Sequence, residues 1–398
     1  MSKTQHTKTH EHMAAFALGF RPFFLGASAL AVVAVSLWLG VYHFGVSLGF
    51  ATLSPTLWHA HELIYGYAMA VIAGFLLTAV RNWTGIQTAD GWKLLALFSL
   101  WAIARITLFF GDAFIAVAAA SDLAFVAALS AGVIIPIRRS RQWRQLAILS
   151  KLVLLGVGNL LFYAGSLGLL EQGGRWGVYT GLYLVIGLIL TMGRRVIPGF
   201  IERGVGYPVE LSNRRWVDLS SMGLFVVFFI LDTFTPFKWI AGWVAMALFL
   251  LHAIRAIGWH TSGIWQKPLL WSLYLGYLFI TLGFGLYGLN ALADFGSYFI
   301  GIHAFATGGI GLITLSMMAR VSLGHTGRDV HTPPKALNRA LVLVCLAAVV
   351  RVLMPAVDAQ HYSVWILFSA ALWILGFMVF ACVYFPILSR PRVDGLPG

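Results

Sequence analysis

Runs of about 20 mostly apolar residues follow one another along almost the whole chain, and this feature limits the possible folds most. A helix of about that length crosses the hydrocarbon core of a bilayer. Only 10% of the residues are charged, whereas a soluble domain carries about 25%, so we exclude a soluble enzyme. Helices satisfy their own backbone hydrogen bonds in lipid. The sequence therefore predicts an all-α polytopic membrane bundle.

We predict twelve transmembrane helices with no soluble domain inserted between them. The predicted spans lie near residues 23–48, 57–80, 92–111, 113–137, 146–170, 176–198, 216–233, 238–258, 268–289, 297–320, 337–357 and 362–388. The chain then divides into an N-terminal tail (1–22), a twelve-helix membrane domain (23–388) and a C-terminal tail (389–398).

The positions of the basic residues predict the orientation of these spans. If both termini are cytoplasmic, 23 of the 27 Lys and Arg residues lie in the cytoplasmic tails and loops or at the cytoplasmic ends of spans, and only Arg175 and Lys238 lie on the outer side. The remaining two, Arg105 and Arg351, lie within spans. Such a bias toward cytoplasmic loops is typical of membrane proteins. The net charge of +13 is therefore spread over helix ends rather than gathered in one basic domain, and we predict no nucleic-acid partner.

Six ionisable side chains are predicted to share the outer half of the membrane. Ionisable groups at this depth are costly, so they face the protein interior and usually have a function. From the orientation and a rise of about 1.5 Å per residue, these groups are His59, His61, Glu62, Arg105, His303 and Arg351.

Imidazole is a preferred ligand of iron and copper, so the clustered histidines predict a metal site. We expect His59, His61 and His303 to supply ligands, with His252 of the inner half as a further candidate. The alternative for any single histidine is an interhelical hydrogen bond. On a regular helix His59 and His61 point about 200° apart, so they would not share one metal.

Two residues of the same span are candidates for proton chemistry. Glu62 shares a helix face with His59, and it is a candidate ligand, a partner that orients His59, or a proton carrier. Tyr65 lies one turn after His61 and is a second candidate carrier. The sequence contains no CxxCH motif, so any haem would be non-covalently bound b-type.

Several motifs resemble the NnrS family of bacterial membrane proteins. The matching segments are Gly19–Leu25 (GFRPFFL), Trp58–Glu62 (WHAHE), Gly74–Ala79 (GFLLTA), His303–Phe305 (HAF) and Met318–Arg328 (MARVSLGHTGR). Members are described as twelve-span proteins with haem and copper that take part in the response to nitric oxide. The resemblance thus implies haem b, copper and nitric oxide, and a location in the bacterial cytoplasmic membrane.

With this resemblance, we expect a nitric oxide reductase-like oxidoreductase that converts nitric oxide to nitrous oxide. Glu62 and Tyr65 would carry protons, and His61 and His303 would also contact haem. Arg105 and Arg351 would pair with its propionates, because a buried dianion needs cations nearby, and Arg320 is a further candidate for cofactor binding. Electrons would come from a quinol or a redox protein. The alternatives are a haem protein that binds or senses nitric oxide without turnover, and a transporter of haem, copper or a metal nitrosyl.

Overall fold

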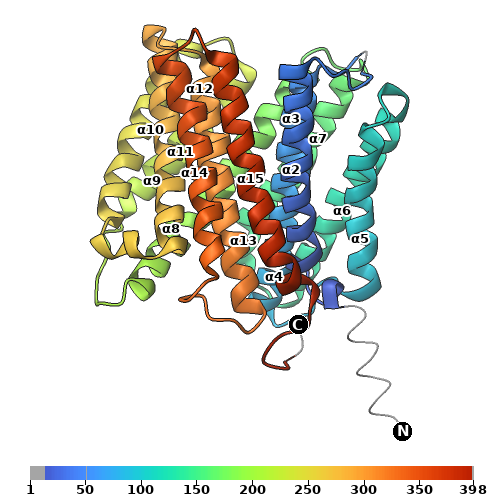
Figure 1. Cartoon of the computed structure of the whole chain (residues 1–398), viewed down its shortest axis with the longest axis vertical. Helices are drawn as coiled ribbons and strands as arrows, with labels where there is room; N and C mark the ends of the chain where they lie inside the picture. The colour runs from blue at the N-terminus through green and yellow to red at the C-terminus, as the bar shows by residue number, and fades with distance from the viewer. Residues whose placement is uncertain (1–13, 51, 397–398) are drawn as a thin grey trace. The chain divides into compact units, whose positions relative to one another are not determined.

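The computed structural model describes residues 14–50 and 52–396, and this part of the chain is helical with no strand. Its twelve long apolar helices confirm the predicted bundle (Figure 1). The second and tenth spans each consist of three consecutive helical segments. The elements of the spans are α2 (Phe20–Phe44), α3 (Pro55–His61), η2 (Glu62–Ala68), α4 (Met69–Thr84), α5 (Gly91–Leu108), α6 (Ile115–Arg139), α7 (Leu146–Ser166), α8 (Gly173–Gly204), α9 (Arg215–Phe234), α10 (Lys238–Trp259), α11 (Pro268–Ala293), α12 (Tyr298–His303), η6 (Ala304–Gly311), α13 (Leu312–His325), α14 (Lys335–Val357) and α15 (Tyr362–Ser389).

The observed helix ends lie within a few residues of the predicted ones. The largest differences are at the ends of α8 and α13, which continue to Gly204 and His325. Both extensions carry polar residues, because a helix can continue into the interfacial region after the apolar run that identifies it has ended. The predicted N-terminal tail lies mostly outside the described residues, and α2 begins at Phe20. The orientation of the spans stays a prediction.

The chain forms two compact units. Unit 1 comprises Met1–Gly181, Met318–Ala336 and Phe377–Gly398, and unit 2 comprises Leu182–Met317 and Leu337–Gly376. In unit 1, α2 packs on α4, and α6 packs on both α5 and α7. In unit 2, α10 packs on α9 and α11, and α11 packs on α12 and η6. Each unit therefore has a helical core of its own.

The second and tenth spans contain π-helical segments at matching places. Each span starts after a serine whose hydroxyl accepts a backbone N–H: Ser54 from Leu57 and Ser297 from Phe299. A short α-helix then ends at a histidine, His61 or His303, and a π-helix follows directly. Such segments are rare and occur often at functional sites. They mark these two spans, one in each unit, as candidates to carry a site.

Candidate functional site

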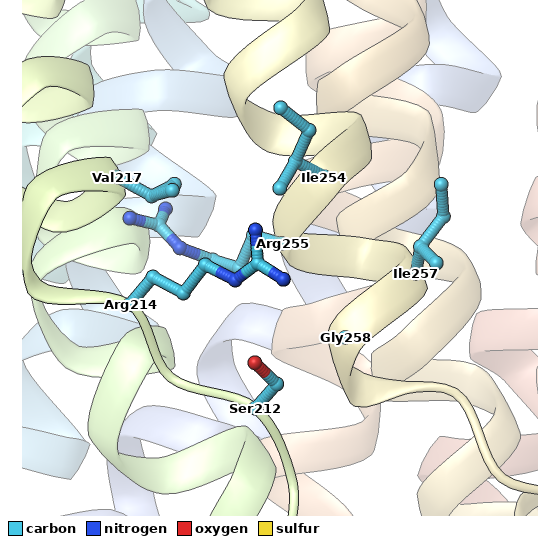
Figure 2. Close-up of a pocket in the computed structure, with 7 residues that line it drawn as sticks. All are labelled: Ser212, Arg214, Val217, Ile254, Arg255, Ile257 and Gly258. Atoms are coloured by element: carbon cyan, nitrogen blue, oxygen red, sulfur yellow. The ribbon is translucent and has the colours of Figure 1, made fainter.

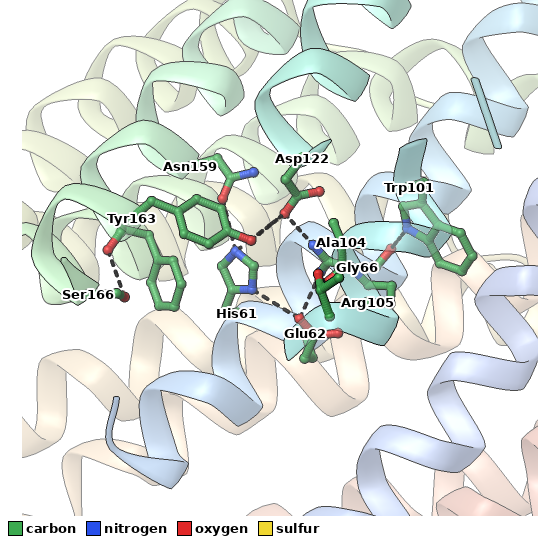
Figure 3. Close-up of polar contacts among 12 residues, drawn as sticks. His61, Glu62, Gly66, Trp101, Ala104, Arg105, Asp122, Asn159, Tyr163 and Ser166 are labelled. Atoms are coloured by element: carbon green, nitrogen blue, oxygen red, sulfur yellow. Dashed lines mark hydrogen bonds and ion pairs between the residues drawn. The ribbon is translucent and has the colours of Figure 1, made fainter. Parts of the chain in front are cut away.

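Six buried polar side chains from four spans of unit 1 form a hydrogen-bonded group, which we call the unit 1 network (Figure 3). Burying so many polar groups in a membrane domain is costly unless they pair with one another. The members are His61, Glu62, Arg105, Asp122, Asn159 and Tyr163.

Both ring nitrogens of His61 face oxygen atoms. Nδ1 lies 3.1 Å from Glu62 Oε1, and Nε2 lies 2.9 Å from the Asn159 side-chain oxygen and 3.7 Å from Asp122 Oδ2. The ring also stacks on Phe162, with centroids 3.9 Å apart. Two acceptors suit a ring that donates from both nitrogens. In this arrangement His61 directs no lone pair toward a metal ion.

Arg105 joins the two carboxylates of the network. It donates to Glu62 Oε1 at 2.8 Å and also to Asp122 Oδ2, which accepts a further hydrogen bond of 3.0 Å from the Tyr163 hydroxyl. Both carboxylates are fully buried, and Arg105 is nearly so. One guanidinium thus faces two carboxylates, so the group is electrically neutral only when it holds one further proton. His61 and the two carboxyl groups are the members of the network that could accept that proton.

Four atoms of the network have no hydrogen-bond partner among the described residues: Glu62 Oε2, Asp122 Oδ1, Asn159 Nδ2 and Arg105 Nε. An unsatisfied buried polar atom costs about 1–3 kcal/mol, so four in one group are unusual. Two of the four are carboxylate oxygens, which can take up a proton. The network therefore offers more than one position for the proton that neutrality requires.

Tyr65, the second predicted proton carrier, lies beside His61 but donates its proton elsewhere. Its hydroxyl donates to the backbone oxygen of Gly177 at 2.7 Å. The ring lies against Gly181, where an added Cβ would be 2.7 Å from the Tyr65 Cζ atom. The His61 and Tyr65 rings have centroids 5.1 Å apart. Tyr65 is thus a neighbour of the network that is held by a backbone carbonyl.

His252 of unit 2 has one nitrogen in a polar contact and one without a partner. Nδ1 lies 2.6 Å from the Tyr277 hydroxyl and 3.1 Å from Arg255 Nη1. Nε2 is buried and has no hydrogen-bond partner in the described part of the chain. The ring lies parallel to Phe284, at 5.4 Å between centroids. Because a guanidinium group only donates, Nδ1 is the acceptor in the contact with Arg255, and a ring with one proton carries it on Nε2.

His303 of unit 2 contacts Arg351, which the sequence placed at the same depth in the membrane. Its Nδ1 lies 2.8 Å from the backbone oxygen of Phe299, so Nδ1 carries the proton and Nε2 has the lone pair. That lone pair accepts from Arg351 at 3.3 Å, and Arg351 also donates to the Tyr362 hydroxyl at 3.2 Å. The structure thus brings together His303 and Arg351, which the sequence placed at one depth.

The other candidates lie apart from these contacts. His59 stacks on Trp38, with centroids 4.5 Å apart, whereas His61 stacks on Phe162. Arg320 is half-buried near the end of α13. Among residues 14–50 and 52–396, no group of three or more His, Cys, Asp or Glu side chains is suited to hold a metal ion. The metal and cofactor roles of the candidates stay predictions.

Sequence reasoning missed three members of the network: Asp122, Asn159 and Tyr163. A signal was available, because Asp122 is the one acidic residue within the predicted span 113–137. Asn159 and Tyr163 are four residues apart in the next span and so share one helix face. The expectation of a regular helix after His61 was wrong, since Glu62 begins a π-helix. Glu62 there contacts His61, its direct neighbour in the chain.

The fold and the network define the class as a multi-pass membrane protein with buried ionic groups inside its helical bundle. The family model for the NnrS protein matches residues 14–392, which is almost the whole chain. The chain belongs to the NnrS family. Membership in this family implies a membrane protein of the nitric oxide response. A comparison with curated proteins finds no match.

Proposed function

We propose that this protein removes nitric oxide by reducing it to nitrous oxide. Two molecules of nitric oxide, two electrons and two protons give one nitrous oxide and one water, so the reaction needs a source of each. We assign the electrons to a quinol or a reduced redox protein. Family membership supports nitric oxide as the substrate, and the chain itself supports a source of protons inside the membrane domain.

The observation that carries the proposal is the charge of the unit 1 network. Glu62 and Asp122 share one guanidinium, that of Arg105, and all three are buried. The network therefore holds one proton more than its fully ionised carboxylates would. Glu62 Oε2 has no partner among the described residues, so it is the atom from which we expect a proton to leave. After the release, two carboxylates would share one guanidinium, so the network would have to take up another proton before the next turnover.

The implied cofactors fit the described residues to different degrees. His252 is the residue that would hold a haem, because its Nε2 is buried without a partner among the described residues. Ligation there would require the ring proton to leave Nε2. Tyr277 would orient that ring through Nδ1, as the outer partners of metal-bound histidines do. When bound, haem supplies the one-electron chemistry that nitric oxide reduction requires. The described residues do not fit a multi-histidine copper site, so we assign no step to copper.

The proposal is tested by anaerobic turnover of the purified full chain with nitric oxide and a quinol, with nitrous oxide as the product measured. Glu62→Gln keeps the shape of the side chain but cannot release a proton, so we expect turnover to fall at least about tenfold. The matched control is Glu171→Gln, which changes an exposed glutamate on a connecting turn. Both variants should retain the same haem content.

The outcomes separate the proposal from its alternatives. Catalytic nitrous oxide formation that is lost in Glu62→Gln and kept in Glu171→Gln supports it. Uptake of one nitric oxide per haem without nitrous oxide would favour a binding or sensing protein. Haem-loaded protein that neither binds nor turns over nitric oxide would refute both functions.

A further inference from the structure

A cavity of about 230 Å³ lies in unit 2, between the start of α9 and the end of α10 (Figure 2). It is separate from the unit 1 network. The residues that line it are Ser212, Arg214, Val217, Ile254, Arg255, Ile257 and Gly258. The predicted orientation places this cavity at the cytoplasmic boundary of the membrane.

The cavity has an excess of positive charge. Arg214 is exposed, and its guanidinium makes no hydrogen bond or ion pair with any described residue. Arg255 is 6% exposed and donates to Asp218 at 2.7 Å, while Arg194 donates to the other oxygen of Asp218 at 3.3 Å. The carboxylate of Asp218 thus contacts two guanidinium groups, and the third guanidinium of this region, that of Arg214, has no carboxylate partner among the described residues. The N-terminus of α9 also lies here, and its N-cap residue, Arg214, makes no capping hydrogen bond through its side chain. The positive end of the helix dipole therefore adds to the positive potential of the cavity.

One wall of the cavity is apolar and open to the membrane. Ile257 is 75% exposed and Ile254 is 38% exposed, although both belong to a membrane-spanning helix. Trp216, two residues after Arg214 in the sequence, is 51% exposed. Exposed apolar side chains at the end of a span contact lipid, and tryptophan is typical of the interfacial region. An occupant of this cavity can thus combine a charged group with an apolar body.

We propose that the cavity binds the phosphate of an anionic phospholipid, with Arg214 as the main contact. Guanidinium groups bind phosphate oxygens in pairs, and basic pockets between helices on the cytoplasmic side are suited to anionic headgroups. Ile254 and Ile257 would contact the upper part of the acyl chains. Arg255 also donates to Tyr277 at 3.0 Å, so the bound phosphate lies one side chain away from the Tyr277–His252 pair.

Lipid binding to the purified full chain, measured by native mass spectrometry, tests this proposal. The probes are phosphatidylglycerol, zwitterionic phosphatidylcholine and inorganic phosphate. We expect Arg214→Gln to weaken phosphatidylglycerol binding about fivefold, since one basic residue near a membrane surface contributes about 1 kcal/mol. The matched control is Arg215→Gln, because Arg215 is the next residue, is also exposed and does not line the cavity. Both sites are exposed, so both variants should fold.

The proposal predicts that Arg215→Gln binds phosphatidylglycerol as the unchanged protein does, and that phosphatidylcholine binds less tightly to all three proteins. An equal loss in both variants would overturn it, because the attraction would then be a general surface charge effect. Binding of inorganic phosphate that depends on Arg214, without a preference for the anionic lipid, would overturn the lipid assignment. This test does not depend on nitric oxide turnover, so its result is independent of the proposed function.

Discussion

Removing the guanidinium of Arg105 tests the charge balance of the unit 1 network directly. Arg105→Gln keeps some hydrogen-bonding capacity but leaves Glu62 and Asp122, both fully buried, without their shared cation. Removing one partner of a buried ion pair costs about 3–5 kcal/mol. We therefore expect the free energy of unfolding to fall by about that amount, which lowers the folded-to-unfolded ratio by about two to four orders of magnitude.

A second substitution should restore part of that loss. In the double variant Arg105→Gln/Asp122→Asn, Glu62 is the one carboxyl group left in the network, and it contacts His61 at 3.1 Å. The repulsion between two buried carboxylates is then absent, so we expect the double variant to be more stable than Arg105→Gln alone by about 1–3 kcal/mol. The asparagine can still accept the hydrogen bond that Tyr163 donates to residue 122.

The assay is unfolding of the purified protein by titration with a denaturing detergent, followed by tryptophan fluorescence. Arg144→Gln, which changes an exposed arginine, serves as the control and should shift stability by less than about 0.5 kcal/mol. The reasoning would be refuted if Arg105→Gln were as stable as this control. It would also be refuted if Asp122→Asn added to the loss instead of reducing it.

Three further predictions follow from the same structure. Gly181→Ala should destabilise the protein by about 1–3 kcal/mol, because the new Cβ would lie 2.6 Å from Ile64 Cγ2 and 2.7 Å from both Cζ and the hydroxyl oxygen of Tyr65. Tyr65→Phe removes only the hydroxyl contact, so Gly181→Ala/Tyr65→Phe should still be less stable than Tyr65→Phe alone, and detergent unfolding measures both. His252→Ala should reduce the haem retained per protein in the optical spectrum, and unchanged haem would exclude it as the axial ligand. Hydrogen bonds from Arg392 lower the pKa of Asp394 to about 2, so the contact between the two side chains should persist at pH 4 and be lost only as the pH falls through about 2. Carbon-13 NMR of labelled aspartate measures the titration of Asp394. A titration near the ordinary pKa of aspartate would contradict the prediction.

The bundle was predictable because hydropathy and helix length are properties of single segments. The same holds for depth: Glu62 and Arg105 were expected in one layer and lie 2.8 Å apart, and His303 and Arg351, expected likewise, lie 3.3 Å apart. The direction in which a side chain points depends on regular helix geometry, which fails where η2 begins at Glu62. A π-helix turns less per residue than an α-helix, so predicted faces shift along the span.

The partners of a buried charge were harder to predict, because they come from other spans and depend on how helices pack. Asp122 reaches Arg105 from α6, and Tyr163 reaches Asp122 from α7. Neither pairing has a signature in sequence spacing. The available signal was the presence of single polar residues within apolar runs, since such residues are seldom placed in lipid without a partner.

A comparison with the other fully buried carboxylate of the described residues strengthens the argument for a bound proton. Asp232 of unit 2 is also 0% exposed, but it contacts the ammonium group of Lys238 at 2.9 Å and accepts hydrogen bonds from three tyrosine hydroxyls, those of Tyr183, Tyr287 and Tyr298. One cation therefore balances one carboxylate there, and both carboxylate oxygens have partners. In the unit 1 network one cation serves two carboxylates, and each carboxylate keeps an oxygen without a partner among the described residues. The two sites differ in charge balance and also in the exposure of their cations, since the side chain of Lys238 is 40% exposed and that of Arg105 is 4% exposed. We infer from the excess of buried carboxylate that the unit 1 network is the site suited to hold a proton.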